Sequence, residues 1–249
     1  MKISVITAVH NAETTLAEAI ASVASQTFPD IEHIVIEGHS SDRSLAVLAR
    51  AAHARMTLYS EPDSGIYDAL NKGIARATGD VIGFVHADDF LAHDKVLERV
   101  AAAFADPGVE AVYSDLDYVA RTDTARIVRH WKSAPFESWR LRRGWMPPHP
   151  TFYLRREAFE RLGDFDTGLR ISADYDLMLR FFTETAGRSV HIPEVTYKMR
   201  TGGISNRDWQ KIRQKMREDY QVIRRNRAGG VVTLLAKNLS KLGQFLPGS

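Results

Sequence analysis

Carboxylates stand at four places along the chain where a predicted strand ends or a predicted helix begins. They are Glu37 in VIEGHSSD, Asp63 in SEPDSGIYDALNKG, Asp88 and Asp89 in FVHADDF, and Asp174 in ISADYDLMLR. In an open α/β sheet, ligands bind outside the carboxyl ends of the strands. A hard divalent cation such as Mg²⁺ or Mn²⁺ prefers carboxylate, phosphate and water oxygens, so it would bridge such carboxylates to a diphosphate. The pattern therefore predicts a site for a nucleotide-diphosphate substrate and its metal ion.

Four strand–helix units are expected to position the first three of these carboxylate sites. Apolar runs at Ile3–Val9, 33–36, Met56–Ser60 and 81–85 predict strands, and apolar residues at helical spacing predict helices after each of them. The first helix runs through Leu16, Ile20 and Val23, with Asn11 or Thr14 as its cap. The other three are expected at about 45–52, 67–77 and 95–104. Repeated strand–helix units with apolar strands favour an α/β fold with a mostly parallel, doubly wound sheet.

The pattern loosens after residue 108, and this half is expected to receive a second substrate. Paired strands are predicted at Ala111–Val119 and 124–132, followed by a proline-rich, aromatic and basic loop at 142–156 that leads into a strand. Then come a helix at Ala173–Glu184, a strand at 190–200, a glycine loop at 201–205 and a polar helix from about 207 to 225. There is no internal repeat.

Composition narrows the class of protein. The chain has 249 residues, 44% of them hydrophobic, which is enough for one large α/β domain or two small ones. It has no cysteine, which excludes disulfides, thiolate metal sites and a cysteine nucleophile, and fits a reducing compartment. Neither a secretory signal nor an apolar run of the ~20 residues needed to span a membrane is present in the sequence. A cytoplasmic protein is expected, soluble or peripheral to the inner face of the membrane.

Positive charge is concentrated in the C-terminal segment. The chain carries a net charge of +2, but residues 205–249 hold 10 Lys or Arg against 3 Asp or Glu. This asymmetry speaks against a nucleic-acid-binding protein, in which basic and aromatic residues would interleave over one face. After Gly229 and Gly230 the apolar residues are predicted to share one helical face, with Lys237 and Lys241 elsewhere; these are Val231, Leu234, Leu235, Leu239, Leu242 and Leu246. Residues 229–246 are thus expected to contact an anionic membrane surface, a second subunit of a homodimer or their own domain, and the first is favoured.

Several segments, in this order, resemble the inverting family-2 glycosyltransferases with the GT-A fold, especially the small bacterial enzymes that build surface polysaccharides. They are SVITAVHNAETTLAEAIASVASQTF, HIVIEGHSSD, EPDSGIYDALNKGIARATGDVIGFVHADD and LGDFDTGLRISADYDLMLR. The resemblance covers about residues 1–205. It implies a nucleotide-sugar-binding half at 1–108, an acceptor-binding half at 109–205, and a basic helical tail at 206–249.

The resemblance also implies roles for individual carboxylates. It assigns Asp89 to a Mn²⁺ or Mg²⁺ ion, Asp88 to the metal and the ribose, and Glu37 to the base of the nucleotide. Most relatives have Asp-Gly where this chain has Glu37 and Gly38. The catalytic aspartate of the family carries over to Asp174, which would take a proton from the acceptor hydroxyl.

Further residues are assigned by the same resemblance, with plainer alternatives left open for some. Those expected to line the nucleotide-sugar pocket are Thr7, Val9, Asp63, Asp68, Asn71 and Lys72. Arg200 is expected near the diphosphate, and Trp145 and His149 near the acceptor. The alternatives are a surface arginine, a tryptophan packed against the domain and a plain loop histidine. Asp174 could instead cap a helix, and Glu37 could be a solvated loop acid.

The function predicted from the sequence is metal-dependent, inverting transfer of a hexose-type sugar. The donor would be a nucleotide-diphosphate sugar, with UDP favoured, and the acceptor a hydroxyl of a glycan or a lipid-linked saccharide in surface polysaccharide biosynthesis. One alternative is a sugar-nucleotide pyrophosphorylase, but VITAVHNAETT lacks the glycine-rich, basic phosphate loop of such enzymes. The other is a catalytically silent nucleotide- or glycan-binding module, which the substitution Asp174→Asn would distinguish from an enzyme.

Overall fold

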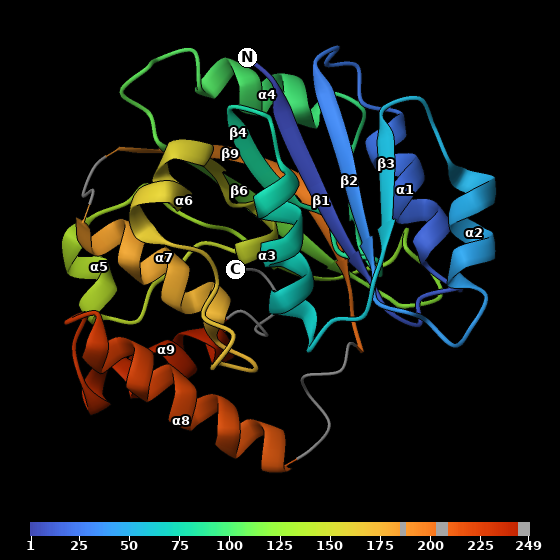
Figure 1. Cartoon of the computed structure of the whole chain (residues 1–249). Coiled ribbons are helices and arrows are strands. Elements are labelled where there is room, and N and C mark those ends of the chain that lie inside the picture. The colour runs from blue at the N-terminus through green and yellow to red at the C-terminus, as the bar shows by residue number, and fades with distance from the viewer. Residues whose placement is uncertain (185–187, 203–208, 244–249) are drawn as a thin grey trace.

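A sheet of nine strands with helices on both faces forms the centre of the molecule (Figure 1). The computed structural model describes residues 1–184, 188–202 and 209–243. The sheet has the order β3-β2-β1-β4-β8-β6-β9-β5, with β7 beside β6. The strands are β1 Ile3–Val9, β2 Ile31–Glu37, β3 Met56–Ser60, β4 Val81–Phe84, β5 Phe90–Leu91, β6 Ala111–Val119, β7 Ile127–Trp131, β8 Tyr153–Arg155 and β9 Ser189–Arg200.

The first four strands are parallel, as the repeated strand–helix units predict. β1 lies between β2 and β4, and β3 pairs with β2. The connecting helices are α1 Leu16–Ala24, α2 Ser44–Ala51, α3 Ile66–Arg76 and, after β5, α4 Val96–Ala103. Because parallel strands end at one edge, the loops after β1, β2 and β3 meet there.

The predicted cap of the first helix is wrong. Helix α1 begins at Leu16, and its N-cap residue is Thr15, which makes no side-chain cap hydrogen bond. Asn11 has a left-handed φ of 51°, and its Oδ1 accepts a hydrogen bond from the backbone N–H of Ser41. Asn11 therefore ties the loop after β1 to the loop after β2, which spacing along one helix could not reveal.

The second half of the sheet mixes directions. β8 is antiparallel to both β4 and β6, whereas β6 and β9 are parallel. The predicted pairing of β6 with β7 is confirmed. Four short elements were not predicted, namely β5, helix α5 Ser138–Arg142, the 3-10 helix η1 His149–Thr151 and helix α6 Arg156–Leu162. Each contains too few residues to show a periodic pattern of apolar side chains.

Helix α7, Ala173–Glu184, lies between the sheet and the C-terminal helices α8, Trp209–Arg225, and α9, Val231–Gly243 (Figure 1). Val222, Ile223 and Leu234 of these helices join the same hydrophobic core as α3, α6 and α7. Helices α1 and α4 contribute to the core on the other face of the sheet. The C-terminal helices thus cover α7, which explains why most of its side chains are buried.

The last helix exposes most of its predicted apolar face, although Leu234 is buried, and it also buries Lys237. Lys237 is only 2% exposed, whereas Val231, Val232, Leu235 and Leu239 are 56%, 78%, 52% and 63% exposed. Lys237 Nζ lies 2.9 Å from the buried carboxylate of Asp219. A buried charge requires a partner, so α9 turns its lysine inward and leaves aliphatic side chains outside.

The side chains of Leu242 and Leu246, the start of the predicted polar helix and most of the glycine loop lie outside the described residues. No helix within the described part of the chain is both long and apolar enough to cross a bilayer.

Candidate active site

Glu37 ends β2 and is fully buried at the sheet edge. Its Oε1 accepts a hydrogen bond of 2.5 Å from the backbone N–H of Ser40, and its Oε2 accepts one of 2.6 Å from the Ser60 hydroxyl. Burial disfavours the charged carboxylate, but these hydrogen bonds outweigh it and lower the pKa of Glu37. Glu37 is therefore no solvated loop acid, and it fastens the loop that follows β2.

Asp63 lies against the same loop. A Cβ on Gly38 would come within 2.1 Å of Asp63 Oδ2, so only glycine lets the two loops approach this closely. The backbone N–H of Gly38 donates to the carbonyl oxygen of Val9 at 2.9 Å. Asp63 Oδ1 accepts a hydrogen bond of 2.9 Å from Gly65. The ends of β1, β2 and β3 thus meet at Gly38, as the parallel sheet predicts.

Three other residues of the predicted nucleotide pocket make contacts within the protein. Asp68 accepts a hydrogen bond from the backbone of Ser64 and pairs with Lys72 at 3.2 Å, and Lys72 also donates to a backbone carbonyl. Asn71 exchanges two hydrogen bonds with the backbone of Phe165, at 2.8 and 3.0 Å. Asn71 therefore joins α3 to the segment that leads to Asp174.

Thr7 and Val9 lie on the buried strand β1. The Thr7 hydroxyl is 3.0 Å from His33 Nε2 within the sheet. Val9 belongs to a hydrophobic cluster with Leu16 and Leu48. Both side chains therefore pack inside the protein, below the loops that follow β1 and β2.

Asp88 and Asp89 follow β4 in a turn that β9 fastens. The backbone N–H of Arg200 donates to Asp89 Oδ1 at 2.8 Å, and the Arg200 guanidinium donates to the carbonyl oxygen of Asp88 and to Glu18. Arg200 is 5% exposed and is therefore no surface arginine. Burial, together with the charge of Asp88, raises the pKa of Asp89 well above its usual range. The turn thus holds two carboxylates so close together that the charge of Asp88 disfavours the ionised form of Asp89.

The donor set at this turn fits a divalent cation. Asp88 is half-buried, and no described residue donates a hydrogen bond to its carboxylate. A cation would relieve the repulsion that raises the pKa of Asp89. Within residues 1–184, 188–202 and 209–243, no group of three or more His, Asp or Glu side chains could hold a metal. The ion would therefore take most of its ligands from water and from a diphosphate, as Mg²⁺ commonly does.

Asp174 is the second residue of α7 and is half-buried. Its Oδ1 accepts a hydrogen bond of 2.8 Å from the backbone N–H of Tyr175. The Tyr67 hydroxyl lies 3.3 Å from the same oxygen and 2.7 Å from the carbonyl oxygen of Ile171. In the part of the chain that the structure describes, nothing donates to Asp174 Oδ2, which leaves that oxygen available to a ligand.

Tyr67 was missed by the sequence reasoning. Burial and then the charge of Asp174 raise the pKa of its phenol, so Tyr67 stays protonated and can donate. The two residues are 107 positions apart, and no local pattern connects them.

His86 is half-buried and His149 is buried, and the charges of nearby carboxylates act on both. The rings of His86 and His149 lie 5.9 Å apart. Burial lowers the pKa of His86, while the charges of both Asp88 and Asp174 oppose this shift. Burial also lowers the pKa of His149 to about 4. The Nε2 atom of His149 has no hydrogen-bond partner among the described residues. Both carboxylates thus act on His86, and Asp174 also acts on His149.

Trp145 lies in an aromatic cluster beside this region. Its ring contacts Tyr113, Phe136 and Phe182, with centroids 5.8, 6.0 and 5.5 Å away. The side chain is half-buried and packs against the core, as the plainer alternative expected.

Comparisons with known proteins show the family of this chain. The Glycosyl transferase family 2 model matches residues 4–171, which ends just before Asp174. A PGL/p-HBAD biosynthesis glycosyltransferase of Mycobacterium bovis (strain BCG) is 31% identical over 209 residues, covering 82% of this chain and 78% of that protein. The O-antigen biosynthesis protein RfbC of Myxococcus xanthus is also 31% identical, but the match covers 82% of this chain and only 16% of that protein.

Two solved structures share the fold. S. aureus TarS 1-349 in complex with UDP-GlcNAc has a TM-score of 0.68 at 18% identity, covering 91% of this chain and 65% of that one. The mannosyltransferase PcManGT from Pyrobaculum calidifontis, in complex with GDP-Man and Mn²⁺, has a TM-score of 0.67 at 22% identity, covering 98% and 70%. The chain spans somewhat less than two thirds of the S. aureus TarS 1-349 chain.

Proposed function

The chain belongs to glycosyltransferase family 2, and we propose that it moves one sugar from a nucleotide-diphosphate sugar to a hydroxyl of a glycan or lipid-linked saccharide, with inversion at the anomeric carbon. The observation that carries this proposal is the free Oδ2 of Asp174, a carboxylate whose charge acts on the same histidine, His86, as the charge of Asp88. Relatives named for glycolipid and O-antigen biosynthesis support the acceptor class.

Asp174 acts as the general base. Its Oδ1 is held by Tyr175 and faces Tyr67, so Oδ2 receives the proton of the acceptor hydroxyl. As the proton leaves, the hydroxyl oxygen attacks the anomeric carbon, the bond from that carbon to the diphosphate breaks, and the nucleoside diphosphate departs. Asp174 lies in the first turn of α7, where the helix dipole stabilises its charge. The Tyr67 hydroxyl donates to the carbonyl oxygen of Ile171 at 2.7 Å, which fixes the backbone before Asp174.

The donor is bound by the other end of the site. Asp88 and Asp89 would hold a Mn²⁺ or Mg²⁺ ion, with Asp88 offering the more open carboxylate. When bound, such an ion neutralises charge on the departing diphosphate. Arg200 fixes the turn that carries both aspartates. We place the nucleoside against Asp63 and the loop that Glu37 fastens.

A stability measurement with nucleotide-sugars tests this assignment. The melting temperature is measured with UDP-, GDP-, dTDP- and CMP-sugars, with and without Mn²⁺. A ligand at 100 times its dissociation constant stabilises the folded state by about 2.7 kcal/mol. Stabilisation by one nucleotide class that requires Mn²⁺ and disappears in Asp88→Asn is expected. No stabilisation by any donor, with or without metal, contradicts the proposal.

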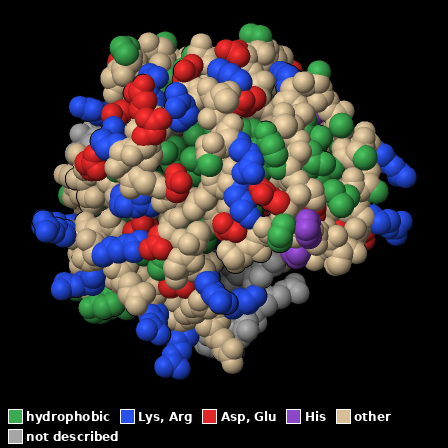
Figure 2. Space-filling model, in the orientation of Figure 1, with side chains coloured by type: hydrophobic (Ala, Val, Ile, Leu, Met, Phe, Trp, Pro, Cys, Tyr) green, Lys and Arg blue, Asp and Glu red, His purple; other side chains and the backbone are tan. Residues whose placement is uncertain are grey.

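The outer face of α9 supports a peripheral location on an anionic phospholipid surface. Val232 and Leu235 are exposed, while Thr233 ties α9 to α5, because its hydroxyl donates to the carbonyl oxygen of Arg142 at 2.9 Å. Trp139 of α5 is 46% exposed. Residues 138–149 and 220–249 contain no Asp or Glu. Basic side chains project at the left and lower edges of the molecule in Figure 2, where α5 and α8 lie in Figure 1. Aliphatic side chains with a basic rim suit the interface of an anionic bilayer.

Vesicle sedimentation tests this location. The protein is expected to bind vesicles that contain phosphatidylglycerol and to stay in solution with pure phosphatidylcholine vesicles. Val232→Glu combined with Leu235→Glu should abolish binding, because it adds negative charge to the apolar face. Leu45→Glu, at a side chain 42% exposed on α2, is the matched control and should bind normally. Formation of a dimer that the double variant disrupts, with no vesicle binding, would favour a subunit contact instead.

A further inference from the structure

The buried carboxylate of Glu218, on helix α8, contacts the backbone segment just before Asp174. Glu218 Oε2 accepts hydrogen bonds from the backbone N–H groups of Ile171 at 2.8 Å and Ser172 at 3.0 Å. Its Oε1 accepts one from Arg170 at 3.2 Å. One side chain therefore receives three consecutive backbone donors, ending two residues before Asp174.

Asp219, the next residue of α8, holds the same segment through a side chain. Its Oδ1 accepts a hydrogen bond of 2.7 Å from the Ser172 hydroxyl. Lys215 and Lys237 each approach its Oδ2 at 2.9 Å. Lys237 Nζ also lies 3.3 Å from the centre of the Tyr175 ring, next to Asp174. Helices α8 and α9 thus contact residues on both sides of Asp174.

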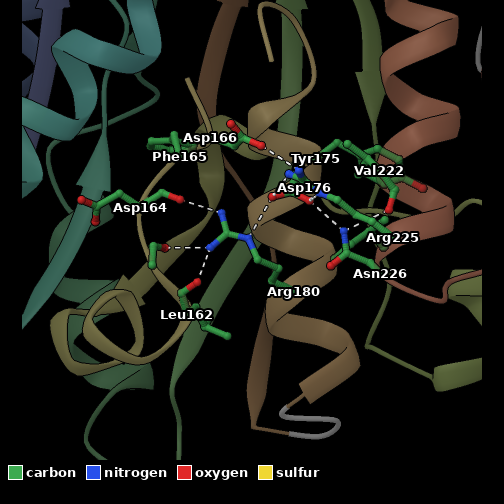
Figure 3. A network of polar contacts seen from close by, with 12 residues as sticks. Leu162, Asp164, Phe165, Asp166, Tyr175, Asp176, Arg180, Val222, Arg225 and Asn226 are labelled. Atoms are coloured by element: carbon green, nitrogen blue, oxygen red, sulfur yellow. Dashed lines mark hydrogen bonds and ion pairs between the residues drawn. The ribbon is translucent and has the colours of Figure 1, made fainter. Parts of the chain in front are cut away.

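A third carboxylate completes this arrangement from α7 itself (Figure 3). Asp176 is 1% exposed and accepts hydrogen bonds from Arg180 at 2.9 Å, Arg225 at 2.7 Å and Asn226 at 2.7 Å. Arg225 and Asn226 belong to the end of α8 and the residue after it. Arg180 also donates to three carbonyl oxygens of the loop before α7, those of Leu162, Gly163 and Asp164. The loop and the first turns of α7 are therefore held to α8 through polar contacts.

The packing of α8 against α7 does not by itself require the buried charges of Glu218, Asp219 and Asp176. A buried ion pair is often no more stabilising than well-packed apolar side chains of the same volume, because its desolvation is costly. Backbone hydrogen bonds, in contrast, fix position and direction to a fraction of an ångström, and a misplacement of about 1 Å can cost roughly 100-fold in rate. Polar contacts concentrated on residues 170–172, Tyr175 and Asp176 suit the alignment of Asp174.

We propose that Glu218 and Asp219 are positioning residues, which act on the transfer reaction by holding Asp174 in place. The proposal rests on the function proposed above for Asp174. It also gives the C-terminal helices a role in the active site, although the matched family segment ends at residue 171. The exposed outer face of α9 is a separate feature, because Lys237 lies on its inner face.

Kinetics of conservative variants test the proposal. Glu218→Gln keeps the size of the side chain and one acceptor but loses the charge, and Ser172→Ala removes the donor to Asp219. Both are expected to lower kcat, by about 10- to 100-fold for Glu218→Gln, while KM for the donor stays within about twofold. The control is Glu184→Gln at the far end of α7, where an exposed glutamate pairs with Arg161. It should keep the wild-type kcat.

A double variant separates positioning from general stability. If Glu218 acts through Asp174, then adding Glu218→Gln to Asp174→Asn should lower the residual rate no further. An equal additional loss in that background, or an unchanged kcat in Glu218→Gln alone, would overturn the proposal.

Hydrogen exchange measures the same contact without catalysis. The amides of Ile171 and Ser172 should exchange at least about tenfold faster in Glu218→Gln than in the wild type, with the rest of α7 unaffected. Unchanged protection of these two amides would refute the positioning role even if the protein transferred no sugar at all. Wild-type protein that transfers nothing, with both amides deprotected in the variant, would instead refute the proposed function and keep the contact.

Discussion

The two ends of the site are held in place by different kinds of contact. At the donor end, Glu37 is fixed by Ser40 and Ser60, close to it in the sequence or on the next strand. At the catalytic end, the segment before Asp174 is fixed by Glu218, 46 to 48 residues away. Parallel strands bring the loops that follow them together at one edge of the sheet. The segment before helix α7 is instead held in place by contacts with another helix, α8. The catalytic end should therefore be the more sensitive to changes far away in the chain.

The largest effect is expected from the base itself. Asp174→Asn removes the proton acceptor and should lower the transfer rate about 1000-fold, because a general base typically contributes 10²- to 10⁴-fold. Stabilisation by the donor should persist, since the donor end is held independently. The measurement is kcat by nucleotide release, alongside melting temperature with donor and Mn²⁺. If Asp174→Asn also abolished donor binding, the donor end would not be independent of the catalytic end.

The next largest effect is expected at the donor end. Asp88→Asn should raise the Mn²⁺ concentration needed for half-maximal transfer and lower the rate about 100-fold at fixed metal, which is roughly 2.7 kcal/mol. Metal titrations of transfer measure both quantities, with the exposed Asp94→Asn as control. Normal metal dependence in Asp88→Asn would move the cation site away from this turn.

A stability effect is expected where α7 meets α8. Asp176→Ala removes the acceptor of Arg180, Arg225 and Asn226, and should lower the free energy of unfolding by about 2 kcal/mol. Urea unfolding measures the loss, with the exposed Asp30→Ala as control. If the two variants unfold alike, the polar contacts of Figure 3 are not what fastens α8 to α7.

The smallest effect is expected at the local contact of the donor end. Glu37→Gln keeps one acceptor, so the free energy of unfolding should fall by about 1 kcal/mol. The donor dissociation constant should change less than about threefold, because Glu37 acts through the loop it fastens. Calorimetric titration with the donor measures this constant. A tenfold weaker donor would instead support direct contact of Glu37 with the base, as the resemblance implies.

Apolar periodicity predicted the strands and helices of the first half, and it placed Ala173–Glu184 at its observed bounds. It could not predict β5 or α5, which are too short to show a period. Periodicity also did not reveal that Lys237 is buried, because its partner, the carboxylate of Asp219, lies on another helix.

Motifs in the sequence singled out Asp88, Asp89 and Asp174 as candidates, and in the structure the charges of Asp88 and Asp174 both act on His86. The contacts that orient them could not be read from spacing. Tyr67 reaches Asp174 across 107 positions, and Arg200 reaches Asp89 across 111. Such pairs depend on how the sheet order β4-β8-β6-β9 folds the second half back onto the first.

The most direct test of base-assisted single displacement is the configuration of the released sugar. The donor selected by the nucleotide panel, in its α-linked form, is incubated with the protein and Mn²⁺, with water as the acceptor. Proton NMR identifies the anomer before it equilibrates. The β-anomer should appear first with the wild type, and Asp174→Asn should release almost none. Initial release of the α-anomer would contradict a single displacement at Asp174, because retention requires a second substitution step.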